Sequence, residues 1–503
     1  MTDDAASRAG GRRLVSGVAW NALGRGLPLL LALALTPVLV GQLGIERWGL
    51  FTLALALVGV FGMLDLGVGP ALTRALSERI GRGERAGEGE LVASALAALV
   101  ASSAVFAALA WWGVRPLVER VLNVPPALVE EAIAAMRVLV AAAPLVVANA
   151  ALWGVLAAHQ RFRAANLVTI PVSIFYYLGP VLALMAWNSL VAAFLALVLC
   201  RLANTLSYAW LVRPLVPGIR LAAIRLAPVV PLLRFGGWMT FSSALTQALL
   251  YADRFLIGAL LTLSAVAFYA TPLDLVLRFW ILPVAVAQAL LPALASSFRA
   301  LPAETVALFR KATLLIAAIV LPAAIVLVTF AHPALRLWLG QEFADGGGDV
   351  LRILGVGILF NCLAFAPGSL IEAVGRPDLT ARFAFVQALV FVPLSALLLL
   401  SIGIEGAAIA WSLRAAIDCA GRAAIAARIY PAAAGTIRAL AVPVGASGLG
   451  LAIAASLPSI PAALGLGAVT ALGFAILAWR ALAEGERAAL TLALRSPATV
   501  LRR

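Results

Sequence analysis

The sequence has few of the residues that build metal centres and active sites: two histidines, three cysteines and one lysine among 503 residues. Cys200, Cys362 and Cys419 all fall inside apolar runs, where cysteine behaves as a small apolar residue, so no disulfide framework is predicted. His159 and His332 each stand alone, so neither a metal site nor a cofactor is expected. The sequence also lacks the GxxxxGK[ST] motif that cradles nucleotide phosphates, which argues against a built-in ATPase.

Charged residues are scarce as well. They make up 12% of the chain against 63% hydrophobic residues, a balance far from that of a soluble globular domain. Apolar runs long enough to cross a bilayer recur along the whole chain. We therefore expect an all-α polytopic membrane protein with about 14 transmembrane helices, at residues 17–40, 48–71, 91–113, 134–157, 166–187, 189–212, 235–261, 265–292, 310–330, 350–372, 380–401, 406–427, 439–457 and 461–482.

The basic residues are distributed unequally between the loops on the two sides of these spans. With the N-terminus taken as cytoplasmic, 26 of the 37 basic residues fall on the inner side, 5 on the outer side and 6 within spans. The positive-inside bias then predicts that both termini are cytoplasmic. The net charge of +14 is accounted for by loop arginines that orient the spans during membrane insertion and contact anionic lipid headgroups. No nucleic-acid partner is therefore expected.

The loops leave no room for a folded domain outside the membrane. The longest outer connections, near 114–133 and 331–349, have about 20 residues each, below the roughly 40 that small domains need. The protein is therefore not expected to be an enzyme. A membrane glycan polymerase or glycosyltransferase remains as an alternative, although it would have to work with the few carboxylates of these short loops.

The second half of the chain repeats the first weakly, at an offset of about 215 to 220 residues. Arg137 corresponds to Arg352 and Arg201 to Arg414, and the span exits at 69–72 and 291–294 are similar. The repeat predicts two six-helix lobes and two additional helices. The expected domains are a tail at 1–16, an N-lobe at 17–212, a linker at 213–234, a C-lobe at 235–427, the last two helices at 439–482 and a tail at 483–503.

Several short motifs, each of low specificity alone, occur in a defined order. They are Leu-Asp-Leu-Gly-Val-Gly at 64–69, Tyr-Ala-Asp-Arg-Phe-Leu-Ile-Gly at 251–258, Leu-Arg-Leu-Trp-Leu-Gly-Gln-Glu-Phe at 335–343, Gly-Arg-Pro-Asp-Leu-Thr-Ala-Arg at 375–382 and Gly-Ala-Ala-Ile-Ala-Trp-Ser-Leu-Arg at 406–414. With fourteen spans, they make the chain resemble the Wzx-type polysaccharide-biosynthesis flippases of the multidrug, oligosaccharidyl-lipid and polysaccharide exporter superfamily. The resemblance implies two lobes around a central cavity. It also implies a bacterial cytoplasmic membrane location and the movement of undecaprenyl-diphosphate-linked glycans from the inner to the outer leaflet.

Charged residues inside spans are costly and should face a wet cavity or a partner. Arg201 has Asn204 and Tyr208 on the same helical face, and Arg254 has Gln247 and Tyr251. Two further pairs, Asp274 with Arg278 and Arg414 with Asp418, are spaced to neutralise each other or to serve function. Arg25 and Arg137 lie near span ends, where snorkelling competes with a cavity role. The candidate cavity residues are Arg25, Arg201, Asn204, Gln247, Tyr251, Arg254, Arg278 and Arg414.

A cavity lined by guanidinium, amide and phenol groups suits an anionic, hydroxyl-rich solute. We hypothesise that a lipid-linked glycan diphosphate enters this cavity while its tail stays in lipid, with Asp65, Asp253 or Asp274 as candidates for ion coupling. Polysaccharide polymerase and chain-length proteins are further candidate partners. A drug or organic-cation antiporter of the same superfamily is the nearest alternative. Candidate bending points are Pro28, Pro37, Pro171 and Pro180.

Overall fold

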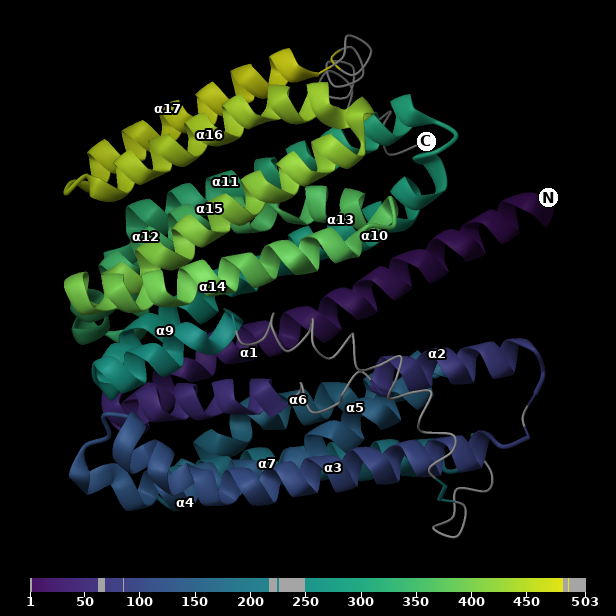
Figure 1. Cartoon of the computed structure of the whole chain (residues 1–503), viewed down its shortest axis with the longest axis vertical. Helices are drawn as coiled ribbons and strands as arrows, with labels where there is room; N and C mark the ends of the chain where they lie inside the picture. Colours follow the sequence, from purple (N-terminus) through teal and green to yellow (C-terminus); the bar gives the residue numbers. More distant parts are fainter. Residues whose placement is uncertain are drawn as a thin grey trace. The chain divides into compact units, whose positions relative to one another are not determined.

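The computed structural model describes residues 2–61, 68–84, 86–216, 224–225, 249–482 and 487, and within these ranges it is helical and contains no strand. The chain is divided into two compact units, which comprise residues 1–267 and 268–503 (Figure 1). The first unit contains α1 (Thr2–Phe61), α2 (Val68–Gly81), α3 (Glu88–Pro116), α4 (Val129–Ala141), α5 (Ala143–Ala158), α6 (Phe162–Ala186), α7 (Leu190–Val212) and a helical stretch at 249–260.

The second unit begins within α9 (Leu263–Leu277). It continues through α10 (Ile281–Ser297), α11 (Pro302–Leu339), α12 (Gln341–Leu363), α13 (Phe365–Ala373), α14 (Pro377–Ile402), α15 (Ile404–Ile429), α16 (Ala434–Ser456) and α17 (Ile460–Ala481). This helical architecture confirms the predicted all-α membrane fold.

The described helices follow the predicted spans, except that residues 62–67 of the second span and those before 249 in the seventh lie outside the described residues. The first span and residues 48–61 of the second lie within α1, which is divided at Gly44, where φ is +73°. Only glycine adopts such a conformation readily, so Gly44 separates two helices. Eleven stretches of the described chain are long and apolar enough to cross a membrane. The twelfth predicted span is not among them because α15 carries Arg414, Asp418 and Arg422.

Two of the predicted spans are interrupted at a single residue, apart from the eighth, which is divided by the 3-10 turn Arg278–Trp280. The fourth is divided at Ala142 into α4 and α5, and the tenth at Ala364 into α12 and α13. Pro144 and Pro367 follow these breaks, and proline cannot donate the backbone hydrogen bond that continues a helix. The helix α6 continues through Pro171 and Pro180, as α1 does through Pro28 and Pro37. The interruptions therefore occur at prolines other than the predicted bending points.

The same helix pairings occur in both units. In the first, α2 packs on α5, α4 on α7 and α6 on α7; in the second, α10 packs on α13, α12 on α15 and α14 on α15. Figure 1 shows α14 and α15 side by side. The interrupted spans occupy equivalent places in this pattern. The arrangement within each unit supports the internal repeat inferred from the sequence.

The first unit extends further along the chain than the predicted N-lobe, which ends at 212. The described residues 249–267 belong to it by their contacts. Asn123 donates from Nδ2 to the carbonyl oxygens of Ala259 at 3.0 Å and Leu261 at 2.8 Å. A Cβ at Gly49 would lie within 1.9 Å of the Leu263 carbonyl oxygen, so that glycine permits a close helix approach. These long-range contacts had no signal in the hydrophobic pattern.

One end of the first unit is held by Glu131. Its Oε2 lies 2.9 Å from Nε of Arg47, and its Oε1 accepts a hydrogen bond from the Leu190 backbone nitrogen at 2.8 Å. Arg47 also donates to Oδ1 of Asn188 at 3.3 Å. A single carboxylate thus connects α1, α4 and the start of α7.

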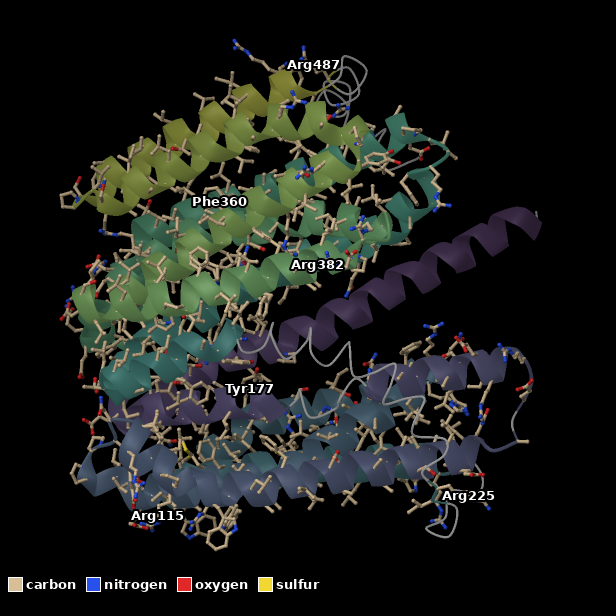
Figure 2. All side chains as sticks on the ribbon, in the orientation of Figure 1. Arg115, Tyr177, Arg225, Phe360, Arg382 and Arg487 are labelled. Atoms are coloured by element: carbon tan, nitrogen blue, oxygen red, sulfur yellow. The ribbon has the colours of Figure 1, made fainter. Side chains whose placement is uncertain are left out.

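We expect Glu131→Ala to lower the free energy of unfolding by about 2 kcal/mol, because hydrogen bonds to charged groups are lost. Chemical denaturation in detergent micelles, followed by tryptophan fluorescence, measures the change. Glu130→Ala is the matched control. Glu130 is 75% exposed and bonds to Arg115, which Figure 2 labels near α4, so its removal should cost less than about 0.5 kcal/mol. Equal effects of the two variants would contradict the bridging role of Glu131.

Candidate substrate-translocation site

Arg201 lies near the middle of α7 and stacks on an aromatic ring of the preceding helix. Its Cζ is 5.7 Å from the centroid of the Tyr176 ring, a cation–π distance. The ring of Tyr176 in turn meets Tyr177 edge-on, at 5.7 Å and 84°. A small pocket of about 10 Å³ beside Arg201 is lined by Tyr176 and, on α1, by Leu55 and Val58. That volume is enough for about one water molecule.

The polar face of α7 continues one turn beyond Arg201. Thr205 donates to the Arg201 carbonyl oxygen at 2.9 Å and accepts from Nδ2 of Asn149 at 3.4 Å. Asn204 lies half-buried on this part of the helix. Tyr208 is buried in an apolar cluster with α2, α3 and α5, and its hydroxyl lies 2.5 Å from that of Thr169. Of the predicted stripe, Arg201 and Asn204 are therefore the more accessible members, and Tyr208 belongs to the core.

Arg254 stacks on its own helix. Its Cζ lies 5.6 Å from the ring centroid of Tyr251, and it is only 3% exposed. Asp253 is 9% exposed, so two ionisable side chains are withdrawn from the surface at adjacent positions. The Tyr251 ring packs against Gly59 on α1, where a Cβ would come within 2.5 Å of Cε2. Both Asp253 and Arg254 have partners within the protein, as expected for ionisable groups at this depth.

The surroundings of Arg201 and of Arg254 each include one of two consecutive residues of α1. Val58 lines the pocket beside Arg201, and Gly59 receives the ring that lies below Arg254. Consecutive helical residues point about 100° apart, so two faces of one turn of α1 each contact one group. Within the first unit, one turn of α1 therefore lines the pocket beside Arg201 and contacts the tyrosine ring on which Arg254 stacks.

In the second unit, Arg278 lies in a 3-10 turn, Arg278–Trp280, that joins α9 to α10. Asp274 precedes it by one helical turn, and both side chains are half-buried. The indole nitrogen of Trp280 donates to Oδ1 of Asn361 at 2.6 Å, and its ring meets Phe365 edge-on at 6.0 Å. The predicted Asp274 and Arg278 thus adjoin a junction between helices rather than the middle of one.

The predicted pairing of Arg414 with Asp418 is replaced by another. Asp418 bonds to Arg422, one turn further along α15, with Oδ2 2.9 Å from Nε. Gln387 of α14 donates to Oδ1 of Asp418 at 3.1 Å. On a helix, an ion pair is more favourable when the acidic residue precedes the basic one by four positions. Asp418 therefore pairs with Arg422 rather than with Arg414. Arg414 remains half-buried on the same helix.

Three predicted residues lie beyond what the structure shows of side chains. Asp65 and Gln247 fall outside the described residues, and Arg25 lies on α1 in a stretch for which only the helix is described. The cavity and ion-coupling roles given to them stay predictions.

Neither histidine stands alone, contrary to expectation. Nε2 of His159 lies 3.7 Å from Oε2 of Glu88, with the two side chains 6% and 2% exposed. Nε2 of His332 lies 3.7 Å from Oδ1 of Asp349. Both acids are distant in sequence, which is why the sequence pattern did not reveal them. No group of three or more metal-binding side chains occurs among the described residues.

Residues 14–298, more than half of the chain, match the model of a family described as "Polysaccharide biosynthesis protein". The chain belongs to this polysaccharide biosynthesis protein family. A relative from Shigella flexneri, named "Putative O-antigen transporter", is 26% identical over 409 residues, which cover 80% of this chain and 96% of the relative.

Solved structures share the fold of this polysaccharide biosynthesis family member. An inward-facing multidrug resistance MATE family transporter of the MOP superfamily aligns with a TM-score of 0.69 at 17% identity, covering 82% of this chain and 98% of that one. The lipid II flippase MurJ, in an inward closed conformation, aligns with a TM-score of 0.67 at 12% identity, covering 92% and 99%. At such identities the likeness extends to the fold alone.

Sequence reasoning missed several polar partners at the site. Tyr176, Asn149 and Thr169 all contact residues of α7 from other helices, and Gln387 contacts Asp418. A polar or aromatic residue within an otherwise apolar span is the available signal, but helical periodicity relates such a residue only to neighbours on its own helix.

Proposed function

We propose that this protein moves undecaprenyl-diphosphate-linked oligosaccharide units from the inner to the outer leaflet of the bacterial cytoplasmic membrane during the synthesis of a cell-surface polysaccharide. The observation that carries the proposal is that Arg201 and Arg254 each stack on a tyrosine, while consecutive residues of α1 line the pocket beside Arg201 and contact the Tyr251 ring. Family membership and the printed name of the Shigella flexneri relative support it.

The chemistry of the two groups fits a glycan diphosphate. Guanidinium groups donate hydrogen bonds in a fork that matches phosphate oxygens, and they stay charged at every physiological pH. Asn204 and the tyrosine hydroxyls offer donors and acceptors for sugar hydroxyls, and tyrosine faces can cover the apolar side of a sugar ring. In the proposed cycle, the arginines hold the diphosphate while the polyprenyl tail stays in lipid, and the site opens to one side of the membrane at a time.

The orientation, coupling and partners belong to the same proposal. The 26 to 5 distribution of basic residues supports a cytoplasmic location for both termini. Asp253, buried beside Arg254, and Asp274 are the candidates for ion coupling among the described residues. Polysaccharide polymerase and chain-length proteins would receive the units on the outer side. The protein itself would form and break no covalent bond.

Deletion of the gene tests the proposal directly. We expect lipid-linked oligosaccharide units to accumulate in the cytoplasmic leaflet. There, a membrane-impermeant reagent added to intact cells cannot modify them. Expression of the intact chain should restore access of that reagent. Unchanged levels and accessibility of these lipids, together with altered drug susceptibility, would contradict the proposal and favour the antiporter. Lengthened glycan formed by the purified protein would favour the polymerase.

A further inference from the structure

An apolar groove runs along the surface of the second unit between α11 and α17, with a volume of about 770 Å³. The side of the groove formed by α11 follows a helical stripe at intervals of three and four residues: Lys311, Leu314, Leu315, Ala318 and Leu321. The groove is of a size that holds a small-molecule ligand. It lies within one unit and is separate from the arginines of the proposed translocation site.

The opposite side of the groove is formed by α17, with small residues where a bulky side chain would close it. The stripe contains Ala471, Phe474, Ala475 and Ala478. The two helices approach closely at Gly467, where a Cβ would come within 2.5 Å of Cγ2 of Ile325. Towards Lys311 the alanines of both helices leave the space between them unfilled. The groove therefore follows from the sequence, since alanines of both helices lie along it.

The polar end of the groove carries the one lysine of the chain. Lys311 is exposed and forms no hydrogen bond or ion pair with any residue that the structure describes. The apolar run of α11 begins directly after it, and at the end of α17 the groove is lined by Trp479 and Leu482, on either side of Arg480 in the sequence. Lysine and arginine with tryptophan at the end of an apolar run mark the level of the lipid headgroups. The cation thus stands where the apolar groove reaches the membrane surface.

We propose that this groove binds an anionic phospholipid of the adjoining leaflet, with an acyl chain between α11 and α17 and the phosphate at Lys311. Charge complementarity carries the choice of occupant: an apolar channel that ends in an ammonium group without a partner among the described residues matches an apolar chain that ends in an anion. Basic pockets between transmembrane helices are known places for anionic headgroups. The bound lipid would fill the space that the alanines leave and hold α17 against α11.

Native mass spectrometry of the whole protein in mixed micelles tests this site. The probes are phosphatidylglycerol and phosphatidylethanolamine, each added alone at a series of concentrations. We expect Lys311→Gln to weaken retention of phosphatidylglycerol roughly fivefold, by the loss of one headgroup charge, and to leave that of phosphatidylethanolamine unchanged. Ala475→Trp should reduce retention of both lipids, because the indole occupies the groove.

Arg382→Gln provides the matched control, since Arg382 is an exposed arginine on α14, away from the groove (Figure 2). It should bind both lipids as the unaltered protein does. Equal loss of phosphatidylglycerol in the Lys311 and Arg382 variants would overturn the site in favour of general surface charge. Retention by the Ala475→Trp variant, or exclusive retention of polyprenyl phosphate from cell extracts, would overturn it as well. Because none of these variants alters the translocation arginines, failure here is distinguishable from failure of the proposed function.

Discussion

Arg201→Ala is expected to reduce the transfer of lipid-linked units by about 30-fold or more, with an unchanged amount of protein in the membrane. Removing one partner of a desolvated charged contact costs about 2 kcal/mol or more, which corresponds to about 30-fold. The contact at stake is the one proposed between the guanidinium and the diphosphate. The helix should survive, because Arg201 is half-buried and its packing partner is a single tyrosine ring.

Three companion variants separate charge from structure. Arg201→Lys keeps the charge and loses the fork of donors, so it should fall between the original and the alanine variant. Tyr176→Phe keeps the ring that Arg201 stacks on and loses only a hydroxyl, so it should lose less transfer than Arg201→Ala if stacking holds the arginine in place. Arg213→Ala removes an exposed arginine from the end of the same helix and should transfer normally.

The measurement is the rate at which labelled lipid-linked units become accessible at the outer leaflet, in cells that lack the native protein and express each variant at matched levels. Normal transfer by the Arg201→Ala variant would remove Arg201 from the proposed site. A loss shared equally by Arg213→Ala would show that the assay reports general damage to α7.

Asp418→Ala is expected to lower the free energy of unfolding by about 3 kcal/mol. Breaking a buried ion pair by removing one partner costs about 3 to 5 kcal/mol, because the other charge is left without its counterion. The side chains of Asp418 and Arg422 are 13% and 27% exposed, which places the effect at the lower end. Gln387 also loses its acceptor when the carboxylate is removed.

A double-mutant cycle tests whether the loss is specific to the pair. Asp418→Asn with Arg422→Gln removes both charges together, so it should destabilise by less than the sum of the single variants, with a coupling of about 1 to 3 kcal/mol. Arg428→Gln, an exposed arginine further along α15, should change stability by less than about 0.5 kcal/mol. If the losses of unfolding free energy in the two single variants, measured by denaturation in detergent, add up to that of the double variant, the pair observed in the structure contributes no interaction energy.

Much of the fold could be predicted from the sequence because membrane insertion imposes strong rules on composition. Apolar runs must be long enough to cross the membrane, so their number and spacing can be read from the sequence. This holds even for α15, which carries several charges. The helix interruptions had a signal too, in Pro144 and Pro367, but proline is ordinary in membrane helices and the two were not distinguished from Pro171 or Pro180.

The partners of the site residues could be predicted only along a single helix. Helical geometry places Tyr251 one turn before Arg254, and the structure has that ring at cation–π distance. Tyr176, Glu88 and Asp349 come close to Arg201, His159 and His332 from other segments, and periodicity carries no information on such contacts. The extent of the first unit to Ala267 eluded prediction for the same reason, since it depends on bonds such as those of Asn123.

The helix interruptions at Ala142 and Ala364 bear on the history of the chain. They lie 222 residues apart, close to the offset at which the two halves of the sequence correspond, and the helices on either side of each pack in matching pairs. If both halves descend from one ancestral six-helix protein, that ancestor already had a divided fourth helix. The interruption would then be older than the gene fusion itself, and a trait of the single unit before two copies shared one chain.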